Sequence, residues 1–143
     1  MGSVFTKIIA GEIPCYKIYE DERTFAFLDI HPETVGHTLV VPKVEVDKIY
    51  DLEPEDYLAV MKTVKMLAKR MEEVLGARTL IKVIGTDVPH AHVHLVTFDP
   101  NYVYGQEKEL TEEEMRETQA KLAVSDAGYG IGGVNEIEQN KSE

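Results

Sequence analysis

The chain has 143 residues, a formal net charge of −11 and 43% hydrophobic residues, values that suit one globular domain with its own core. The negative charge argues against a nucleic-acid-binding surface, which needs clustered Lys and Arg. The single cysteine, Cys15, excludes an internal disulfide, and no apolar run is long enough to cross a bilayer. We therefore expect a cytoplasmic protein with no membrane partner, with one domain over residues 1–124 and an acidic, glycine-rich, mobile tail over residues 125–143.

The first part of the chain predicts one short helix and three strands. Apolar residues at helical spacing, followed by a glycine, predict a helix over Val4–Ala10. Tyr16–Tyr19 and Thr24–Asp29 are rich in aromatic and branched residues and predict the two strands of a hairpin. His37–Val41 predicts a third strand, which ends at Pro42 because proline has no N–H for a ladder.

The longest predicted helix spans Pro54–Leu75. Proline suits its first position, acidic residues fill its first turn, and Gly76 follows its end. We expect its buried stripe to consist of the apolar residues Leu58, Met61, Val64, Leu67, Ala68, Met71 and Leu75. This stripe should cover one face of a sheet.

The remaining elements complete a predicted α+β fold. Leu80–Ile84 and His90–Phe98 predict the fourth and fifth strands. A capping box of Thr111 and Glu114 predicts a last helix that runs to about Ala123. The fold is then a five-stranded, mainly antiparallel sheet with one long helix packed across it and a short N-terminal helix.

Three of the five histidines alternate in the sequence His90-Ala91-His92-Val93-His94. In a strand, this spacing places all three imidazoles on one face. The cluster is compatible with a polar sheet face, with a zinc site, or with nucleophilic catalysis at phosphorus. We prefer catalysis, because neutral imidazole is a good nucleophile near pH 7 and the strand carries neither a cysteine nor a His-Glu-x-x-His motif. We therefore expect no metal and no cofactor.

The segment His90–Val96 resembles the His-φ-His-φ-His-φ-φ signature of the histidine triad (HIT) family, in which φ is an apolar residue. Three upstream segments, Val4–Pro14, Phe25–Ile30 and Gly36–Lys43, resemble the nucleotide-binding branch of that family in order and spacing. The similarity covers about residues 4–98. It implies a HIT-like fold and a homodimer, with the long helix and the fourth strand in the interface.

The resemblance also implies a hydrolase that acts on a purine nucleoside phosphoramidate or a similar nucleotide conjugate. His92 would attack the α-phosphorus and form a nucleotidyl-histidine intermediate, which water then hydrolyses. His94 would contact phosphate oxygens, and His90 would orient His92 through its backbone carbonyl. His37 would stand behind the triad, or it is a satisfied buried histidine. The alternatives are a dinucleoside polyphosphate hydrolase, a nucleotide-binding partner protein with little turnover, and a metal-binding protein.

A nucleotide pocket is implied as well. Asp29 would accept hydrogen bonds from the ribose hydroxyls, although an Asp at a strand end also commonly caps a turn. The other implied nucleotide-binding residues are Phe5, Ile8, Ile13, Phe27 and Ile30 in an apolar base pocket, and Gly85, Thr86 and Asp87 in the loop before the triad.

This loop departs from the family pattern. It is short, and Thr86-Asp87 stands where the family has Gln or Ser. The fourth strand lacks the usual Asn, and the chain has no Trp. Because a carboxylate beside a phosphate repels it, we interpret Asp87 as a turn residue that points to solvent or to its own loop and has no catalytic role.

Overall fold

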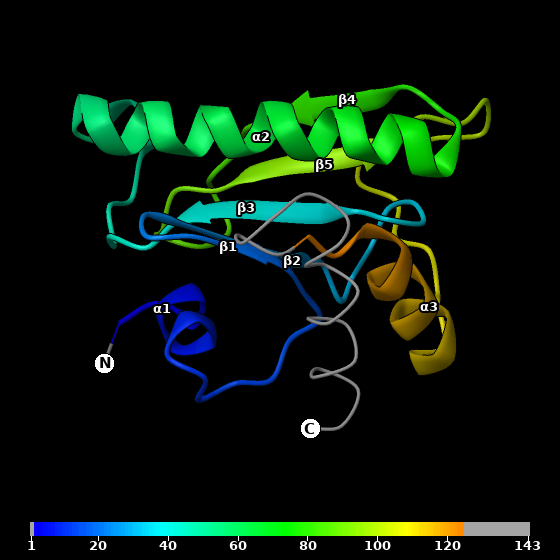
Figure 1. Cartoon of the computed structure of the whole chain (residues 1–143), viewed down its shortest axis with the longest axis horizontal. Coiled ribbons are helices and arrows are strands. Elements are labelled where there is room, and N and C mark those ends of the chain that lie inside the picture. The colour runs from blue at the N-terminus through cyan, green and yellow to red at the C-terminus, as the bar shows by residue number, and fades with distance from the viewer. Residues whose placement is uncertain (1, 125–143) are drawn as a thin grey trace.

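Five strands form one antiparallel sheet in the computed structural model, which describes residues 2–124 (Figure 1). The spatial order is β1-β2-β3-β5-β4, so β1 and β4 are the edges. The strands are β1 Lys17–Glu20, β2 Thr24–Leu28, β3 Thr38–Pro42, β4 Thr79–Lys82 and β5 Val93–Thr97. The predicted α+β fold with its five-stranded sheet is confirmed. The predicted mobile tail over residues 125–143 lies outside the described residues.

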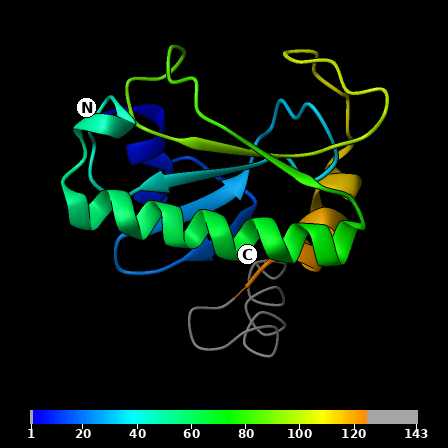
Figure 2. The same ribbon diagram turned by 90° about the horizontal axis from the view of Figure 1, so that it is seen from above.

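The long helix α2 (Pro54–Leu75) has the predicted bounds and lies across one face of the sheet (Figures 1 and 2). Gly76 ends it in the left-handed conformation, at φ +74°, which glycine adopts without steric cost. The predicted buried stripe is partly wrong, because Leu58 is 64% exposed whereas Val60 and Thr63 are buried. Thr63 was missed because a hydroxyl breaks the apolar pattern.

The hydroxyl of Thr63 is satisfied in the interior. Its Oγ1 lies 2.8 Å from Oγ1 of Thr24 on β2, and both residues are buried. A buried hydroxyl with a partner of this kind avoids the cost of an unpaired polar group. The pair therefore joins α2 to the sheet at a position that hydrophobicity alone assigns to the surface.

The sheet has a core on each side. Ala26 and Leu28 of β2 belong to the cluster under α2, whereas Phe25 and Phe27 belong to a second cluster with Phe5. This alternation is the two-residue period of a strand. The short helix α1 (Val4–Ile9), which carries Phe5, therefore covers the sheet on the side opposite α2 (Figures 1 and 2).

The last helix, α3 (Glu112–Leu122), begins with the predicted capping box. Met115 and Leu122 join the cluster under α2, so α3 closes that core at one end. A short 3-10 turn, η1 (Ile49–Asp51), precedes α2. Within the described residues, none of the helices combines the length and the apolar character that crossing a lipid bilayer requires.

The fifth strand begins later than predicted, at Val93 rather than at His90. The N–H of Ala91 donates to the carbonyl of Val46, and the carbonyl of Pro42 accepts from the side chain of His90. Backbone pairing between β3 and β5 therefore does not extend to these residues. The alternation of side chains nevertheless continues, because Ala91 joins the cluster under α2. The fourth strand is also shorter than predicted and ends at Lys82.

Candidate active site

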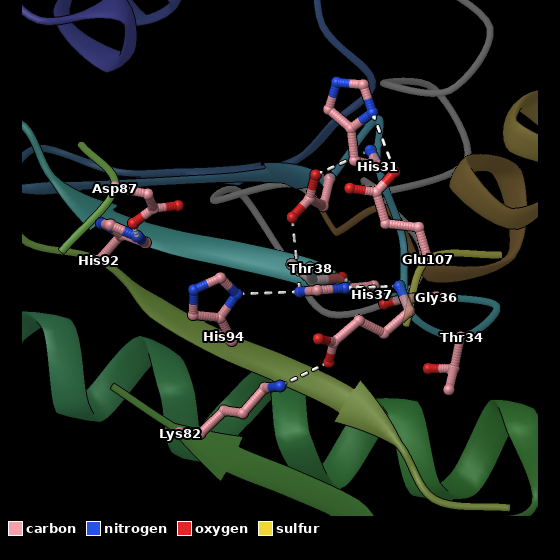
Figure 3. Close-up of polar contacts among 12 residues, drawn as sticks. His31, Thr34, Gly36, His37, Thr38, Lys82, Asp87, His92, His94 and Glu107 are labelled. Carbon is pink, nitrogen blue, oxygen red and sulfur yellow. Dashed lines mark hydrogen bonds and ion pairs between the residues drawn. The ribbon is translucent and has the colours of Figure 1, made fainter. Parts of the chain in front are cut away.

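Four histidines, His37, His90, His92 and His94, are buried on the sheet face that α1 covers, three of which are shown in Figure 3. Neighbouring rings lie 5.1 Å apart for His92 and His94 and 5.2 Å apart for His37 and His94, measured between centroids. The ring of Phe5 stands edge-on to His92 at 5.0 Å. The structure thus brings together the three triad histidines and His37, as the sequence predicts.

The orientation of His92 follows from one hydrogen bond. Its Nδ1 lies 2.7 Å from the carbonyl oxygen of His90, and because a carbonyl only accepts, Nδ1 carries the proton. In the neutral form of the ring, the lone pair is then at Nε2. This atom is buried and forms no hydrogen bond with any residue from 2 to 124.

A chain of hydrogen bonds also determines the proton positions of His37 and His94. The N–H of Glu33 donates to Nδ1 of His37, so the proton of His37 is on Nε2, which donates to Nδ1 of His94 at 2.9 Å. His94 in turn carries its proton on Nε2, and Figure 3 shows this nitrogen on the side of His92. Burial first, and then a neighbouring histidine, lower the pKa of His37 and of His94 to about 4, so both are neutral at pH 7.

His90 is held at both ring nitrogens. Nε2 donates to the carbonyl of Pro42 at 2.8 Å, and the hydroxyl of Ser3 lies 2.7 Å from Nδ1, which accepts. Burial lowers the pKa of His90, which keeps this arrangement neutral. Glu45 accepts from the N–H of Ser3 and from the hydroxyl of Thr6, and thereby fixes the start of α1. Sequence reasoning missed Ser3, although a serine before an apolar helical segment is an N-cap signal.

The hydrogen-bond pattern opposes the zinc interpretation. Ligand atoms of Asp29, His37 and His94 lie within 4.8 Å of one another. A metal at this point needs a lone pair on Nε2 of His37, but that nitrogen carries the proton because Nδ1 accepts from Glu33. A metal held by all three triad histidines is opposed in the same way, since both ring nitrogens of His90 have partners.

Asp29 both caps a turn and faces the histidines. Its Oδ1 accepts from the N–H of His31 at 2.8 Å, and its Oδ2 lies 3.5 Å from Nε2 of His37. Burial is the main cause that raises the pKa of Asp29. The carboxylate keeps unused lone pairs, so the turn-capping role and a ligand-binding role are compatible.

The predicted base-pocket residues are only partly brought together. Phe5 and Phe27 are buried in one cluster, and Ile8 packs against it. Ile30 is 66% exposed beside Asp29, at the end of β2. Ile13 does not belong to this cluster, because the turn after α1 leaves it partly buried elsewhere.

The loop before the triad reaches the nucleophile candidate. Gly85 has φ +76° and allows a sharp change of direction, and Thr86 is exposed. Oδ1 of Asp87 lies 3.3 Å from Nε2 of His92, although the Asp87 side chain is 65% exposed. The expectation that Asp87 turns away from the site is therefore wrong, because the short loop directs one of its oxygens at the ring.

An open cavity of about 420 Å³ adjoins this loop and His92. The other lining residues come from the segment before α2 and from the end of β4, and they include Tyr50 and Ile84. Both side chains are exposed.

A polar network beyond His94 was also missed by sequence reasoning. Lys82 stands opposite His94 in the β4–β5 pair and donates to Glu33 and to the hydroxyl of Tyr102. The N–H of Gly105 donates to the other carboxylate oxygen of Glu33. Burial by itself raises the pKa of Glu33, but the hydrogen bonds to its carboxylate outweigh burial and lower the pKa. The available signal was a single lysine in the apolar segment Leu80–Ile84.

Comparison with known proteins gives a consistent set of matches. The model of the HIT domain family matches residues 10–101. The protein named hit from Bacillus subtilis is 39% identical over 108 residues, which cover 71% of this chain and 72% of that protein. Adenosine 5'-monophosphoramidase hnt1 from Schizosaccharomyces pombe is 35% identical over 107 residues, which cover 73% of this chain and 80% of that protein.

Solved structures agree with these matches. The crystal structure of a Hit-like protein involved in cell-cycle regulation from Bartonella henselae superposes with a TM-score of 0.75. Its sequence identity to this chain is 28%, and the superposition covers 84% of this chain and 92% of that one.

Proposed function

The chain belongs to the HIT domain family, and from this premise we propose that it hydrolyses a nucleoside phosphoramidate or a similar nucleotide conjugate at its α-phosphate, with His92 as nucleophile. The observation that carries the proposal is that two adjacent rings offer an electron-pair donor and a hydrogen-bond donor. His92 presents a lone pair at Nε2, and His94 presents a proton at Nε2. A phosphoryl group needs both an attacking electron pair and a donor to its oxygens.

The proposed reaction has two steps. Nε2 of His92 attacks the α-phosphorus, while Nε2–H of His94 donates to a phosphate oxygen. The resulting nucleotidyl-histidine is then hydrolysed by water, which releases the nucleoside monophosphate. The carbonyl of His90 stabilises the positive charge that His92 acquires, because it accepts a hydrogen bond from Nδ1–H of His92 throughout the reaction.

Residues at the other end of the site support a nucleotide substrate. Asp29 has free acceptor capacity for a ribose diol, and the exposed side chain of Ile30 beside it offers apolar surface for a base. The similarity to a protein named adenosine 5'-monophosphoramidase supports adenosine phosphoramidates as the first substrates to test.

The decisive experiment is a search for the covalent intermediate. The protein is incubated with adenosine and guanosine phosphoramidates and with a dinucleoside polyphosphate, quenched in base because phosphorus–nitrogen bonds are acid-labile, and measured by intact mass and peptide mapping. We expect a nucleotidyl adduct on His92. His92→Ala should lose the adduct and at least about a thousandfold of turnover, with nearly unchanged affinity for the nucleoside monophosphate.

His31→Ala is the matched control, because the His31 side chain is 69% exposed and lies outside the triad. It should keep both the adduct and the turnover. An adduct on another residue, or full turnover in His92→Ala, would remove His92 from the proposed role.

We also propose a homodimer, which the edge strand β4 supports. Ile81 is 51% exposed on this strand, and Val83, directly after it, is 46% exposed. Leu58, on the outer side of α2, is 64% exposed. Exposed apolar residues along an open sheet edge favour pairing with a second strand. Light scattering should give twice the monomer mass, and Ile81→Lys should shift it toward the monomer.

A further inference from the structure

Asp87 contacts the atom that attacks in the proposed reaction (Figure 3). Its Oδ1 lies 3.3 Å from Nε2 of His92, and that nitrogen has no hydrogen bond within the described residues. The ring proton at Nδ1 is already held by the carbonyl of His90. Nε2 of a neutral ring and an ionised carboxylate are both acceptors. The contact is attractive only when one additional proton lies on one of these two atoms.

The surrounding groups leave this proton to the pair formed by Asp87 and His92. His94 already carries a proton on Nε2 and is neutral, and His90 has partners at both ring nitrogens. Asp29 is close enough that the negative charge of Asp87 contributes to raising the Asp29 pKa.

Asp87 is also free to move with the proton. Its side chain is 65% exposed, and its carboxylate forms no hydrogen bond with the residues that the structure describes. A phosphorus atom that bonds to Nε2 needs the space beside this nitrogen, where Oδ1 lies 3.3 Å away, so the Asp87 side chain has to shift. The displaced side chain then lies beside the phosphorus substituents, on an exposed loop that starts at Gly85.

We propose that Asp87 is a catalytic acid and base of this site, an inference that rests on the proposed nucleophilic role of His92. When the phosphate displaces Asp87, Nε2 of His92 keeps its lone pair and the additional proton stays on the Asp87 carboxyl. The bond between Nε2 and phosphorus forms, the bond between phosphorus and the leaving nitrogen breaks, and the proton of Asp87 passes to that nitrogen. The leaving group departs as a neutral amine, and Asp87 is left as a carboxylate.

The second half of the reaction restores the site. A water molecule attacks phosphorus and gives one proton to the Asp87 carboxylate. The bond between phosphorus and Nε2 breaks, and its electron pair returns to Nε2. The products are the nucleoside monophosphate and the amine, and the additional proton is again shared between Asp87 and His92. This cycle assigns basic leaving groups such as amines to the site, because they cannot depart without a proton.

The test compares two substrates that differ only in their need for that proton. Adenosine 5'-phosphoramidate has an amine leaving group, whereas the 4-nitrophenyl ester of adenosine monophosphate releases a phenolate that needs no proton. Asp87→Asn keeps the size of the side chain but cannot donate a carboxyl proton. In the first step, followed as release of the leaving group in a single turnover, we expect it to slow amine release by about a hundredfold or more and 4-nitrophenolate release by less than about threefold. Hydrolysis of the intermediate is common to both substrates and should slow equally. Asp51→Asn, at an exposed acid of η1, is the matched control and should change neither rate.

The outcomes separate this proposal from the proposed function. Equal losses in the release of both leaving groups, or an unchanged or faster release of amine, would overturn the role of Asp87 while a nucleotidyl adduct on His92 still supports the nucleophile. If the unsubstituted protein consumes neither substrate and forms no adduct, the hydrolase proposal fails and the role of Asp87 fails with it.

Discussion

The two faces of the β-sheet are both buried, but different interactions stabilise them. On the α2 face, Val64 and Leu67 belong to one apolar cluster with Val40 and Val93 of the sheet, and the buried hydroxyls of Thr63 and Thr24 contact each other. On the opposite face, which we call the histidine face and define by His37, His90, His92 and His94, four buried imidazoles lie beside a smaller apolar cluster that contains Phe5. His37 and His90 have hydrogen-bond partners at both ring nitrogens, and His94 has one at Nδ1. Several of these partners come from distant parts of the chain.

The comparison indicates where stability and chemistry reside. Apolar packing is non-directional and gains free energy with buried area, so the α2 face needs side chains that fill its volume but few oriented polar partners. A buried imidazole requires a correctly oriented partner at each nitrogen. The exception, Nε2 of His92, is the atom to which we assign the reaction. We therefore expect substitutions on the α2 face to change stability and substitutions on the histidine face to change function.

The largest effect on this comparison should come from Leu67→Ala. Leu67 is 1% exposed at the centre of the α2 face, and its truncation leaves a cavity. We expect the free energy of unfolding to fall by about 2–5 kcal/mol, with an unchanged kcat for the folded protein. Urea denaturation and steady-state kinetics measure the two quantities. A large loss of kcat in fully folded Leu67→Ala would contradict the assignment of stability to one face and function to the other.

Asp29→Ala should produce the opposite result. We expect binding of adenosine monophosphate to weaken by about 1–3 kcal/mol, because charge-assisted hydrogen bonds to the ribose are lost. The free energy of unfolding should change by less than for Leu67→Ala, since only the bond to the N–H of His31 disappears. Calorimetry with the 2',3'-dideoxy analogue is the control. Equal losses for both ligands would contradict the ribose assignment.

The histidine face should also make stability depend on pH. The pKa values of His37 and His94 are lowered to about 4 in the folded protein, against 6.5 for an ordinary histidine. Between these values the unfolded chain binds more protons, so the free energy of unfolding decreases as the pH falls. We expect a slope of about 2 kcal/mol per pH unit between pH 6 and pH 5. For Leu67→Ala, the free energy of unfolding should vary with pH in parallel with that of the unsubstituted protein. A free energy of unfolding that does not change between pH 6 and pH 5 would contradict the neutral state of His37 and His94.

The smallest effect expected is that of Ser3→Ala. Its hydroxyl accepts from the N–H of Thr6 as the cap of α1 and donates to Nδ1 of His90. Losing both bonds should lower the free energy of unfolding by about 1 kcal/mol. Ser3→Thr retains the hydroxyl and should recover the stability in thermal denaturation. A failure of Ser3→Thr to recover it would show that the hydroxyl is not the cause.

Several elements could be predicted from the sequence because their causes are local. The bounds of α2 follow from Pro54 and Gly76, and the start of α3 follows from the capping box of Thr111. The two-residue period of a strand also placed Ala91 opposite the histidines, even though regular pairing begins only at Val93. The histidine spacing led to the HIT family, which the family match confirms. The assigned roles of His92, His94 and Asp29 remain predictions.

The contacts that only the tertiary structure decided join residues far apart in the chain. Ser3 and His90 are 87 positions apart, and Lys82 and Glu33 are 49 positions apart. Neither pair leaves a periodic signal, because hydrogen bonds depend on direction and distance rather than on residue type alone. The same holds for Asp87, which local turn preferences direct to solvent but which the short loop places against His92. Sequence patterns thus determined the strand periodicity that divides His90–His94 between the two faces, and the tertiary contacts determined which nitrogen of each imidazole carries the proton.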